Sequence, residues 1–156
     1  MKIAGVICEY NPFHRGHADH LAETRARTGC DYIVACMTGS FVQRGEAACL
    51  SKWTRAEMAL RSGADAVFEL PALYAIRTAD VFARGGVAIL SGIGADVLSF
   101  GSETADMHLL ESIAELRENE PDCVSNAIRR GLSEGKSHAR AQGEAIAEYL
   151  NLNPEL

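Results

Sequence analysis

Three histidines lie close together near the start of the chain, at His14, His17 and His20. A short apolar run typical of a buried strand precedes them, and the stretch that carries them is expected to continue as a helix. His17 and His20 are three residues apart, so they would share one face of that helix. His14 would stand just before the helix, where unpaired backbone N–H groups and the positive end of the helix dipole attract anions.

This pattern predicts a site for a nucleotide triphosphate. Gly16 has no side chain that would keep a ligand away from the backbone. Imidazole groups add hydrogen-bond donors that can stabilise charge as it develops on a phosphate. Three histidines within seven residues could also bind a metal ion or have no functional role, and the pattern alone leaves these alternatives open.

Residues 9–17, which read Glu-Tyr-Asn-Pro-Phe-His-Arg-Gly-His, resemble the signature of the bacterial tRNA(Met) cytidine acetate ligase family. That family belongs to the nucleotidyltransferase superfamily with a His-x-Gly-His motif. Further blocks resemble the same family in the same order, at residues 41–46, 52–56, 69–71 and 100–103. Many adenylyltransferases share His-x-Gly-His, whereas the Phe-Val-Gln-Arg-Gly block is far more specific.

The resemblance implies an enzyme that activates acetate with ATP and acetylates N4 of the wobble cytidine of elongator tRNA(Met). ATP, with Mg²⁺ held by its phosphates, would be the cofactor, and no metal-ligating side chain is expected. The residues with implied catalytic roles are His14, His17 and Arg44. The expected ATP-binding residues are Ile7, Cys8, Glu9, Tyr10, Asn11, Pro12, Phe13, His14, Arg15, Gly16, His17, His20, Gly101 and Ser102.

Three later residues lie at or just after the carboxyl ends of predicted strands, the edge where open parallel sheets bind ligands. Arg44 could bind a phosphate or a carboxylate through its planar guanidinium, or it could bond a nearby carbonyl. Its position and the family block favour the first role. Glu69 could contact a ligand or accept backbone N–H groups, and Gly101 would let the base or ribose pass close to the backbone.

The alternation of apolar strands and helices predicts an α/β fold with an open, mostly parallel Rossmann-like sheet flanked by helices. The expected strands are residues 2–8, 32–37, 64–70 and 96–100, and the expected helices between them are 14–28, 52–62 and 78–90. After residue 101 only helical patterns occur, at 104–118, 122–132 and 137–150. We expect a Rossmann-like ATP-binding domain over residues 1–120 and a helical extension over residues 121–156.

The helix at residues 52–62 shows a clear apolar stripe. Ser51 is the expected N-cap, although the family usually has aspartate there, so any role of that carboxylate does not carry over. The residues predicted to face inward are Trp53, Ala56, Ala59 and Leu60. Lys52 and Arg55 are expected on the outer or ligand side. In the helix at residues 78–90, Gly85 and Gly86 each cost about 1 kcal/mol relative to alanine, which predicts close packing against another backbone.

The composition is that of an ordinary globular protein, with 47% hydrophobic and 23% charged residues. The net charge of −6 argues against a surface that broadly coats nucleic acid. A local group of basic residues could contact RNA or form a solvated face: Arg129, Arg130, Lys136, His138 and Arg140. The five cysteines have no CxxC spacing, and no bilayer-length apolar run or signal pattern occurs, so we expect a cytoplasmic protein without membrane contact.

Residues 151–156 show no clear terminal element, whereas the family continues with further ATP-contacting motifs and a helical tRNA-binding region. We therefore expect the catalytic portion of the enzyme, with tRNA bound mainly through a C-terminal region that is missing here. A shortened form and a naturally short gene product both remain open. So do two other functions, an adenylyltransferase that makes a dinucleotide or coenzyme, and a nucleotide-binding remnant without catalysis.

Overall fold

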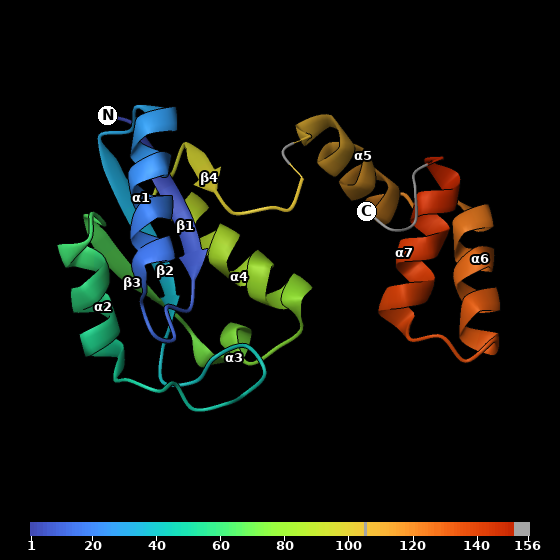
Figure 1. Ribbon diagram of the computed structural model, residues 1–156, viewed down its shortest axis with the longest axis horizontal. Helices are drawn as coiled ribbons and strands as arrows, with labels where there is room; N and C mark the ends of the chain where they lie inside the picture. The colour runs from blue at the N-terminus through green and yellow to red at the C-terminus, as the bar shows by residue number, and fades with distance from the viewer. Residues whose placement is uncertain (105, 152–156) are drawn as a thin grey trace. The chain divides into compact units, whose positions relative to one another are not determined.

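The computed structural model describes residues 1–104 and 106–151 (Figure 1). Its elements are β1 (Ile3–Cys8), α1 (Arg15–Thr28), β2 (Tyr32–Thr38), α2 (Lys52–Arg61), β3 (Ala66–Leu70), α3 (Ala72–Ala75), α4 (Ala79–Gly92), β4 (Val97–Ser99), α5 (Met107–Glu118), α6 (Asp122–Ser133) and α7 (His138–Tyr149). Residue contacts divide the chain into two compact units, residues 1–101 and 102–156. Helix α5 groups with the second unit, although we expected the ATP-binding domain to extend to residue 120.

The first unit contains a four-stranded, wholly parallel sheet in the order β3-β2-β1-β4. This confirms the predicted open α/β fold. Helices α1 and α2 cover one face of the sheet, and α3 and α4 cover the other (Figure 1). Because all the strands run the same way, their carboxyl ends meet at one edge.

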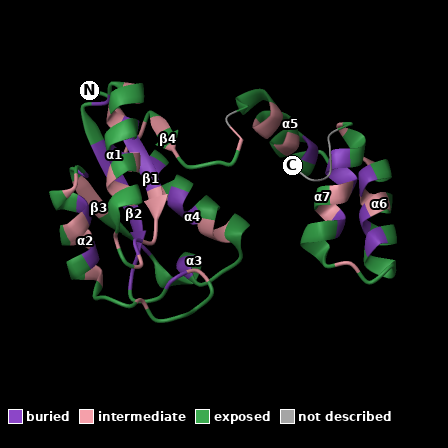
Figure 2. Ribbon diagram, viewed as in Figure 1, coloured by how far each residue is buried: buried purple, intermediate pink, exposed green. Residues whose placement is uncertain are grey.

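The central strand β2 explains the continuous apolar run in the sequence, because both of its faces are buried (Figure 2). Ile33 and Ala35 pack in the apolar cluster under α1 and α2. Val34 and Cys36 pack in the second cluster, under α3 and α4. The shorter β4 pairs with β1 alone and is an edge strand.

The paired glycines of α4 allow close packing, as predicted. A Cβ atom added to Gly86 would lie 2.6 Å from Cδ1 of Ile7, and one added to Gly85 would lie 2.5 Å from Cγ of Tyr74. The prediction was wrong about the partner, because side chains rather than another backbone fill the space beside the glycines. The helix α3 that supplies Tyr74 was not predicted, since four residues after a proline carry no periodic signal.

The predicted inward orientation is wrong for two side chains of α2, Trp53 and Leu60, and the burial of Arg55 on the ligand side was not predicted. Ser51 does cap the helix by accepting from the backbone N–H of Thr54. However, Trp53 is 75% exposed and Leu60 is 46% exposed, while Arg55 is fully buried. Relative to the prediction, α2 turns the side that carries Arg55 toward the sheet, because oxygen acceptors for the guanidinium lie there. A charged side chain is therefore buried on the same face as Ala59.

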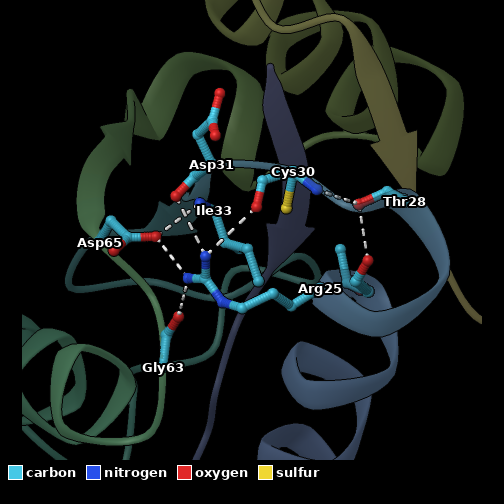
Figure 3. A network of polar contacts seen from close by, with 8 residues as sticks. Arg25, Thr28, Cys30, Asp31, Ile33, Gly63 and Asp65 are labelled. Atoms are coloured by element: carbon cyan, nitrogen blue, oxygen red, sulfur yellow. Dashed lines mark hydrogen bonds and ion pairs between the residues drawn. The ribbon is translucent and has the colours of Figure 1, made fainter. Parts of the chain in front are cut away.

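A polar network fixes the amino-terminal edge of the sheet, opposite the expected ligand edge (Figure 3). The Arg25 guanidinium forms a 2.6 Å ion pair with Asp65 and donates to the carbonyls of Asp31 and Gly63. Asp65 also accepts from the backbone N–H of Ile33 at 2.7 Å. Burial acts to raise the pKa of Asp65, but the Ile33 N–H and the Arg25 guanidinium outweigh it and lower that pKa below 3.8.

The substitution Asp65→Asn should therefore remove acid-sensitive stability. A carboxylate with a lowered folded-state pKa contributes stability above its unfolded pKa and loses it as the pH falls through the folded value. The pair is partly exposed, so we expect a loss of about 1 kcal/mol at neutral pH and no loss below both pKa values. Urea denaturation between pH 2 and pH 7 measures this. Glu57→Gln, which removes an exposed helical ion pair with Arg61, is the control and should change stability by less than about 0.5 kcal/mol.

The second unit consists of helices where it is described, and the helical prediction for this part of the chain is confirmed over residues 106–151. Its core is formed by Leu116, Val124, Ile128, Ala141, Ala145 and Ile146. Helices α6 and α7 approach closely at Gly131, where an added Cβ would lie 2.9 Å from Cβ of Ala141. Of the helices in the described ranges, none combines the length and apolarity that crossing a bilayer requires.

Candidate functional site

The turn between β1 and α1 presents the amino end of a helix at the edge where the carboxyl ends of the strands meet. His14 is the N-cap residue, in an extended conformation with φ −140° and ψ 175°. The first turn of α1, which is described in full, contains no acidic side chain that would neutralise the positive end of the helix. An added Cβ on Gly16 would lie 3.1 Å from Cε1 of His14, so the glycine leaves room for that imidazole.

His14 and His17 form a stacked pair, with ring centroids 3.6 Å apart. The backbone N–H of His14 donates to Nδ1 of His17 at 3.2 Å. Nδ1 of His17 therefore carries no proton, and the neutral ring must be protonated on Nε2. Burial, followed by the neighbouring His14 and His20, lowers the pKa of His17 below 6.5. At neutral pH His17 is thus an uncharged ring whose Nε2–H is a donor.

Two aromatic rings hold His17 in place. Its ring centroid lies 4.8 Å from that of Tyr10 and 5.5 Å from that of Phe13. Tyr10 is only 2% exposed, and its hydroxyl has no hydrogen-bond partner among the described residues. Burial raises the pKa of both Tyr10 and Cys8, so both groups stay protonated at neutral pH. In this arrangement Tyr10 supports His17 from beneath.

His20 is joined to the end of β4 by a chain of hydrogen bonds. The Thr24 hydroxyl donates to the His20 carbonyl at 2.8 Å, so Thr24 Oγ1 must accept from Ser99 Oγ, 2.6 Å away. The Ser99 oxygen must in turn accept from Nε2–H of His20 at 3.0 Å. These bonds fix the His20 tautomer with its proton on Nε2. Sequence reasoning missed Thr24 and Ser99, because their pairing depends on how α1 packs against β4.

Several of the expected ATP-binding residues direct their side chains elsewhere. Ile7 packs against α4 at Gly86, on the opposite face of the sheet from α1. The Glu9 carboxylate accepts from the backbone N–H of Gln43 at 2.6 Å, and Asn11 Oδ1 accepts from that of Cys49 at 2.8 Å. Glu9 and Asn11 thus tie the residue 39–51 loop to the turn before α1.

Arg44 lies at the tip of that loop. The loop doubles back through a 2.9 Å bond from the Val42 N–H to the Glu46 carbonyl and a 2.9 Å bond from the Gly45 N–H to the Val42 carbonyl. Gly45 has a φ of 81°, which glycine adopts without strain. Arg44 is exposed, and within the described parts of the chain its guanidinium has neither a carbonyl nor a carboxylate partner. The alternative of a carbonyl-bonded loop arginine is therefore not what the structure shows.

The remaining expected residues lie at the surface. Pro12 and Arg15 are exposed, and the Arg15 guanidinium lies 4.0 Å from the Asp19 carboxylate. Gly101 is exposed, with nothing within 4 Å of an added Cβ, so the backbone there is open to a ligand. Ser102 is the first residue of the second unit and is also exposed.

Glu69 and the terminal basic residues have internal partners. Glu69 forms a 2.5 Å ion pair with Lys52 at the carboxyl end of β3, which accounts for it structurally. In the second unit, three basic residues lie near carboxylates: Arg130 by Glu148, Lys136 by Glu134 and Glu144, and Arg140 by Glu144. A solvated face with paired charges therefore describes the basic group better than an RNA-binding patch.

Arg55 was expected on the outer or ligand side of α2, but the sequence did not predict that it is fully buried. It donates to the carbonyls of Glu9 and Leu50 and to both oxygens of Thr38. The motif block at residues 52–56 contains it, but nothing in the pattern indicates that it points inward. Among the described residues, no group of three or more histidine, cysteine or acidic side chains is placed to hold a metal ion.

Comparison with known proteins matches residues 1–155 to the family described as HIGH Nucleotidyl Transferase. The tRNA(Met) cytidine acetate ligases of Clostridium novyi (strain NT) and Bacillus subtilis (strain 168) are each 44% identical to this chain, over 99% and 100% of it. A crystal structure of Thermotoga maritima TmcAL bound with alpha-thio ATP superposes with a TM-score of 0.89 and 41% identity over 99% of this chain. The chain spans only 39%, 38% and 39% of the lengths of these three proteins.

Proposed function

The chain belongs to the HIGH nucleotidyl transferase family, and from that membership we propose that it binds ATP at the turn between β1 and α1 and activates acetate as acetyl-adenylate. We further propose that the acetyl group is passed to N4 of the wobble cytidine of elongator tRNA(Met). The names of the relatives support the acetate and the tRNA, since both words stand in "tRNA(Met) cytidine acetate ligase". The ATP analogue named for the Thermotoga maritima structure supports the nucleotide.

One observation in this chain supports the proposal most directly, namely the hydrogen bond from the His14 backbone N–H to Nδ1 of His17. Its Nδ1 accepts from the His14 N–H, so its remaining donor, Nε2–H, is available beside an unneutralised helix amino end. Such a donor is suited to a phosphate because it can strengthen its hydrogen bond as negative charge develops. The ring is uncharged at neutral pH and remains a donor throughout.

The chemistry assigned to the site is an in-line displacement at the α-phosphate. An acetate oxygen forms a bond to phosphorus while the bond to the pyrophosphate oxygen breaks, and pyrophosphate leaves with that electron pair. His14 and His17 would stabilise the equatorial oxygens, and Arg44 would bind acetate or a phosphate through its free guanidinium. Little covalent work falls to the side chains, so positioning and electrostatics account for most of the rate.

Mg²⁺ would enter this site on the nucleotide. We propose that the ion is held by the phosphates, since Mg²⁺ commonly binds through substrate phosphates and keeps several waters. Such an ion supplies positive charge to the phosphates as pyrophosphate leaves. The site residues that we propose for ATP are residues 7–17 together with His20, Gly101 and Ser102.

We propose that most of the tRNA contact is made outside this chain, in segments that its longer relatives have in addition. The chain spans 39% of the Clostridium novyi ligase, and the basic residues of its second unit are largely paired with carboxylates. A cytoplasmic location fits both a tRNA substrate and the five free cysteines.

Acetate-dependent exchange of labelled pyrophosphate into ATP tests the proposal. We expect exchange with ATP, Mg²⁺ and acetate together, and at least tenfold less when acetate is omitted, because the reverse reaction needs acetyl-adenylate. Formate and propionate serve as competing carboxylates. Exchange that does not depend on acetate would favour a general adenylyltransferase, and ATP binding without exchange for any of the three carboxylates would favour a non-catalytic remnant.

A further inference from the structure

Arg55 is a fully buried guanidinium in the first unit, at the end of the sheet where the nucleotide is proposed to bind. All five of its N–H groups have an oxygen acceptor. Nε donates to the Leu50 carbonyl at 3.2 Å, and Nη1 donates to the Glu9 carbonyl and to Thr38 Oγ1. Nη2 donates to the carbonyls of Thr38, at 3.1 Å, and Gly39.

None of these acceptors carries a formal charge. Throughout the described ranges, no carboxylate lies within ion-pair distance of the Arg55 guanidinium, whereas the partly exposed Lys52 on the same helix is paired with Glu69. Buried charges in proteins are normally paired or bound to a ligand of opposite sign. Burial lowers the pKa of Arg55, but a guanidinium stays charged at any physiological pH. The carboxylates of Glu9 and Glu69 lie beyond ion-pair distance and act on the guanidinium only through space, so its positive charge is incompletely offset at this end of the sheet.

The same guanidinium joins three segments of the chain. Glu9 follows the end of β1 and leads into the turn before α1. Thr38 ends β2 and Gly39 follows it, and Leu50 closes the loop that bears Arg44. The Glu9–Gln43 and Asn11–Cys49 bonds add to this connection. The relative placement of the His14–His17 pair and the loop thus depends on one buried side chain.

We propose that Arg55 is a positioning residue for the anion site: its five hydrogen bonds hold the β1–α1 turn against the loop, and its charge favours polyphosphate there. The inference rests on the proposed function for the location of the nucleotide. A purely structural arginine would affect the binding of any ligand to the same extent. A charged positioning residue affects anionic ligands far more than neutral ones of the same shape.

The test compares ATP, adenosine and inorganic tripolyphosphate by isothermal titration calorimetry at two salt concentrations. Arg55→Gln keeps polar groups in the space but removes the charge. We expect it to weaken ATP and tripolyphosphate binding at least tenfold and adenosine binding less than threefold. Arg55→Lys keeps the charge, so the ratio of its ATP affinity to its adenosine affinity should stay within threefold of the unsubstituted value. It cannot make all five hydrogen bonds, so its melting temperature should fall. Arg61→Gln removes an exposed charge on the same helix. It should change neither the ratio of ATP to adenosine affinity nor the melting temperature.

Equal weakening of ATP and adenosine by Arg55→Gln, or unchanged binding of both, would overturn the inference. If that variant does not fold, a tenfold fall in the affinity ratio for Arg55→Lys overturns it instead, and a retained ratio supports it. The two proposals can be separated. A chain that binds ATP with the predicted Arg55 dependence but shows no acetate-dependent exchange leaves the inference standing and rejects the proposed reaction.

Discussion

His17→Asn is expected to lower acetate-dependent ATP–pyrophosphate exchange about a hundredfold while the protein keeps its fold. The asparagine amide can reach the position of Nδ1 and accept from the His14 N–H, so the cap of α1 is retained. It cannot reach the position of Nε2, so the donor that we propose for the phosphates is lost. Initial exchange rates at saturating ATP and acetate, with melting temperatures measured in parallel, give the result.

Two further variants show which nitrogen matters. His17→Gln extends its amide toward the position of Nε2 and should recover part of the rate. His108→Ala removes a fully exposed histidine in the second unit and should leave the rate unchanged. If His17→Asn exchanges at the unsubstituted rate with the same melting temperature, His17 has no part in the reaction.

Gly86→Ala is expected to destabilise the first unit by about 1–3 kcal/mol, although alanine is the better helix former by about 1 kcal/mol. The new methyl group would lie 2.6–2.9 Å from three side-chain atoms of Ile7, in a packed layer between α4 and β1. The free-energy cost of this clash exceeds the gain in helix propensity, because β1 is paired with strands on both sides and cannot shift. Urea denaturation followed by circular dichroism measures the change.

Gly92→Ala is the matched control, since the same substitution at the end of the same helix meets nothing within 4 Å. It should leave stability unchanged or raise it by up to about 1 kcal/mol. In an Ile7→Ala background the cost of Gly86→Ala should disappear, because the space is then free. If the Gly86→Ala protein is as stable as the parent, the packing of α4 against Ile7 leaves room for a methyl group.

The sequence was sufficient for the parts of the fold that depend on local pattern. The strand β2 was recognisable because residues buried on both faces leave no polar alternation, and α1 because Gly29 ends it in the left-handed conformation. The His14–His17 spacing placed two imidazoles at a helix start without knowledge of the tertiary structure. These features need only neighbours within a few residues.

Side-chain directions that depend on distant partners could not be read in this way. Arg55 was expected on the outer or ligand side of α2, and its burial could not be predicted because it depends on the converging carbonyls of Glu9, Thr38 and Gly39. Trp53 was expected in the core because a large apolar side chain usually lies inside, yet it is exposed. The bonds from His20 to Ser99 span 79 positions, beyond the reach of any periodicity.

The functional assignment combines two kinds of information. The geometry favours an anion site, through an open helix end, a neutral imidazole donor and a loop arginine that has no partner among the described residues. Acetate and cytidine enter only through the likeness to longer ligases. The proposals about them therefore need the exchange assay, whereas the anion site can be tested with tripolyphosphate alone.

The dependence of the turn before α1 on Arg55 has a consequence for synthesis at the ribosome. The histidine motif emerges first, yet the group that secures it against the loop comes 38 residues after His17 in the chain. A nascent polypeptide that has exposed β1, α1 and β2 alone would carry the imidazoles on an untethered turn. Nucleotide capture should thus begin only once α2 has left the exit tunnel, so a newly made chain acquires its ligand in one late step.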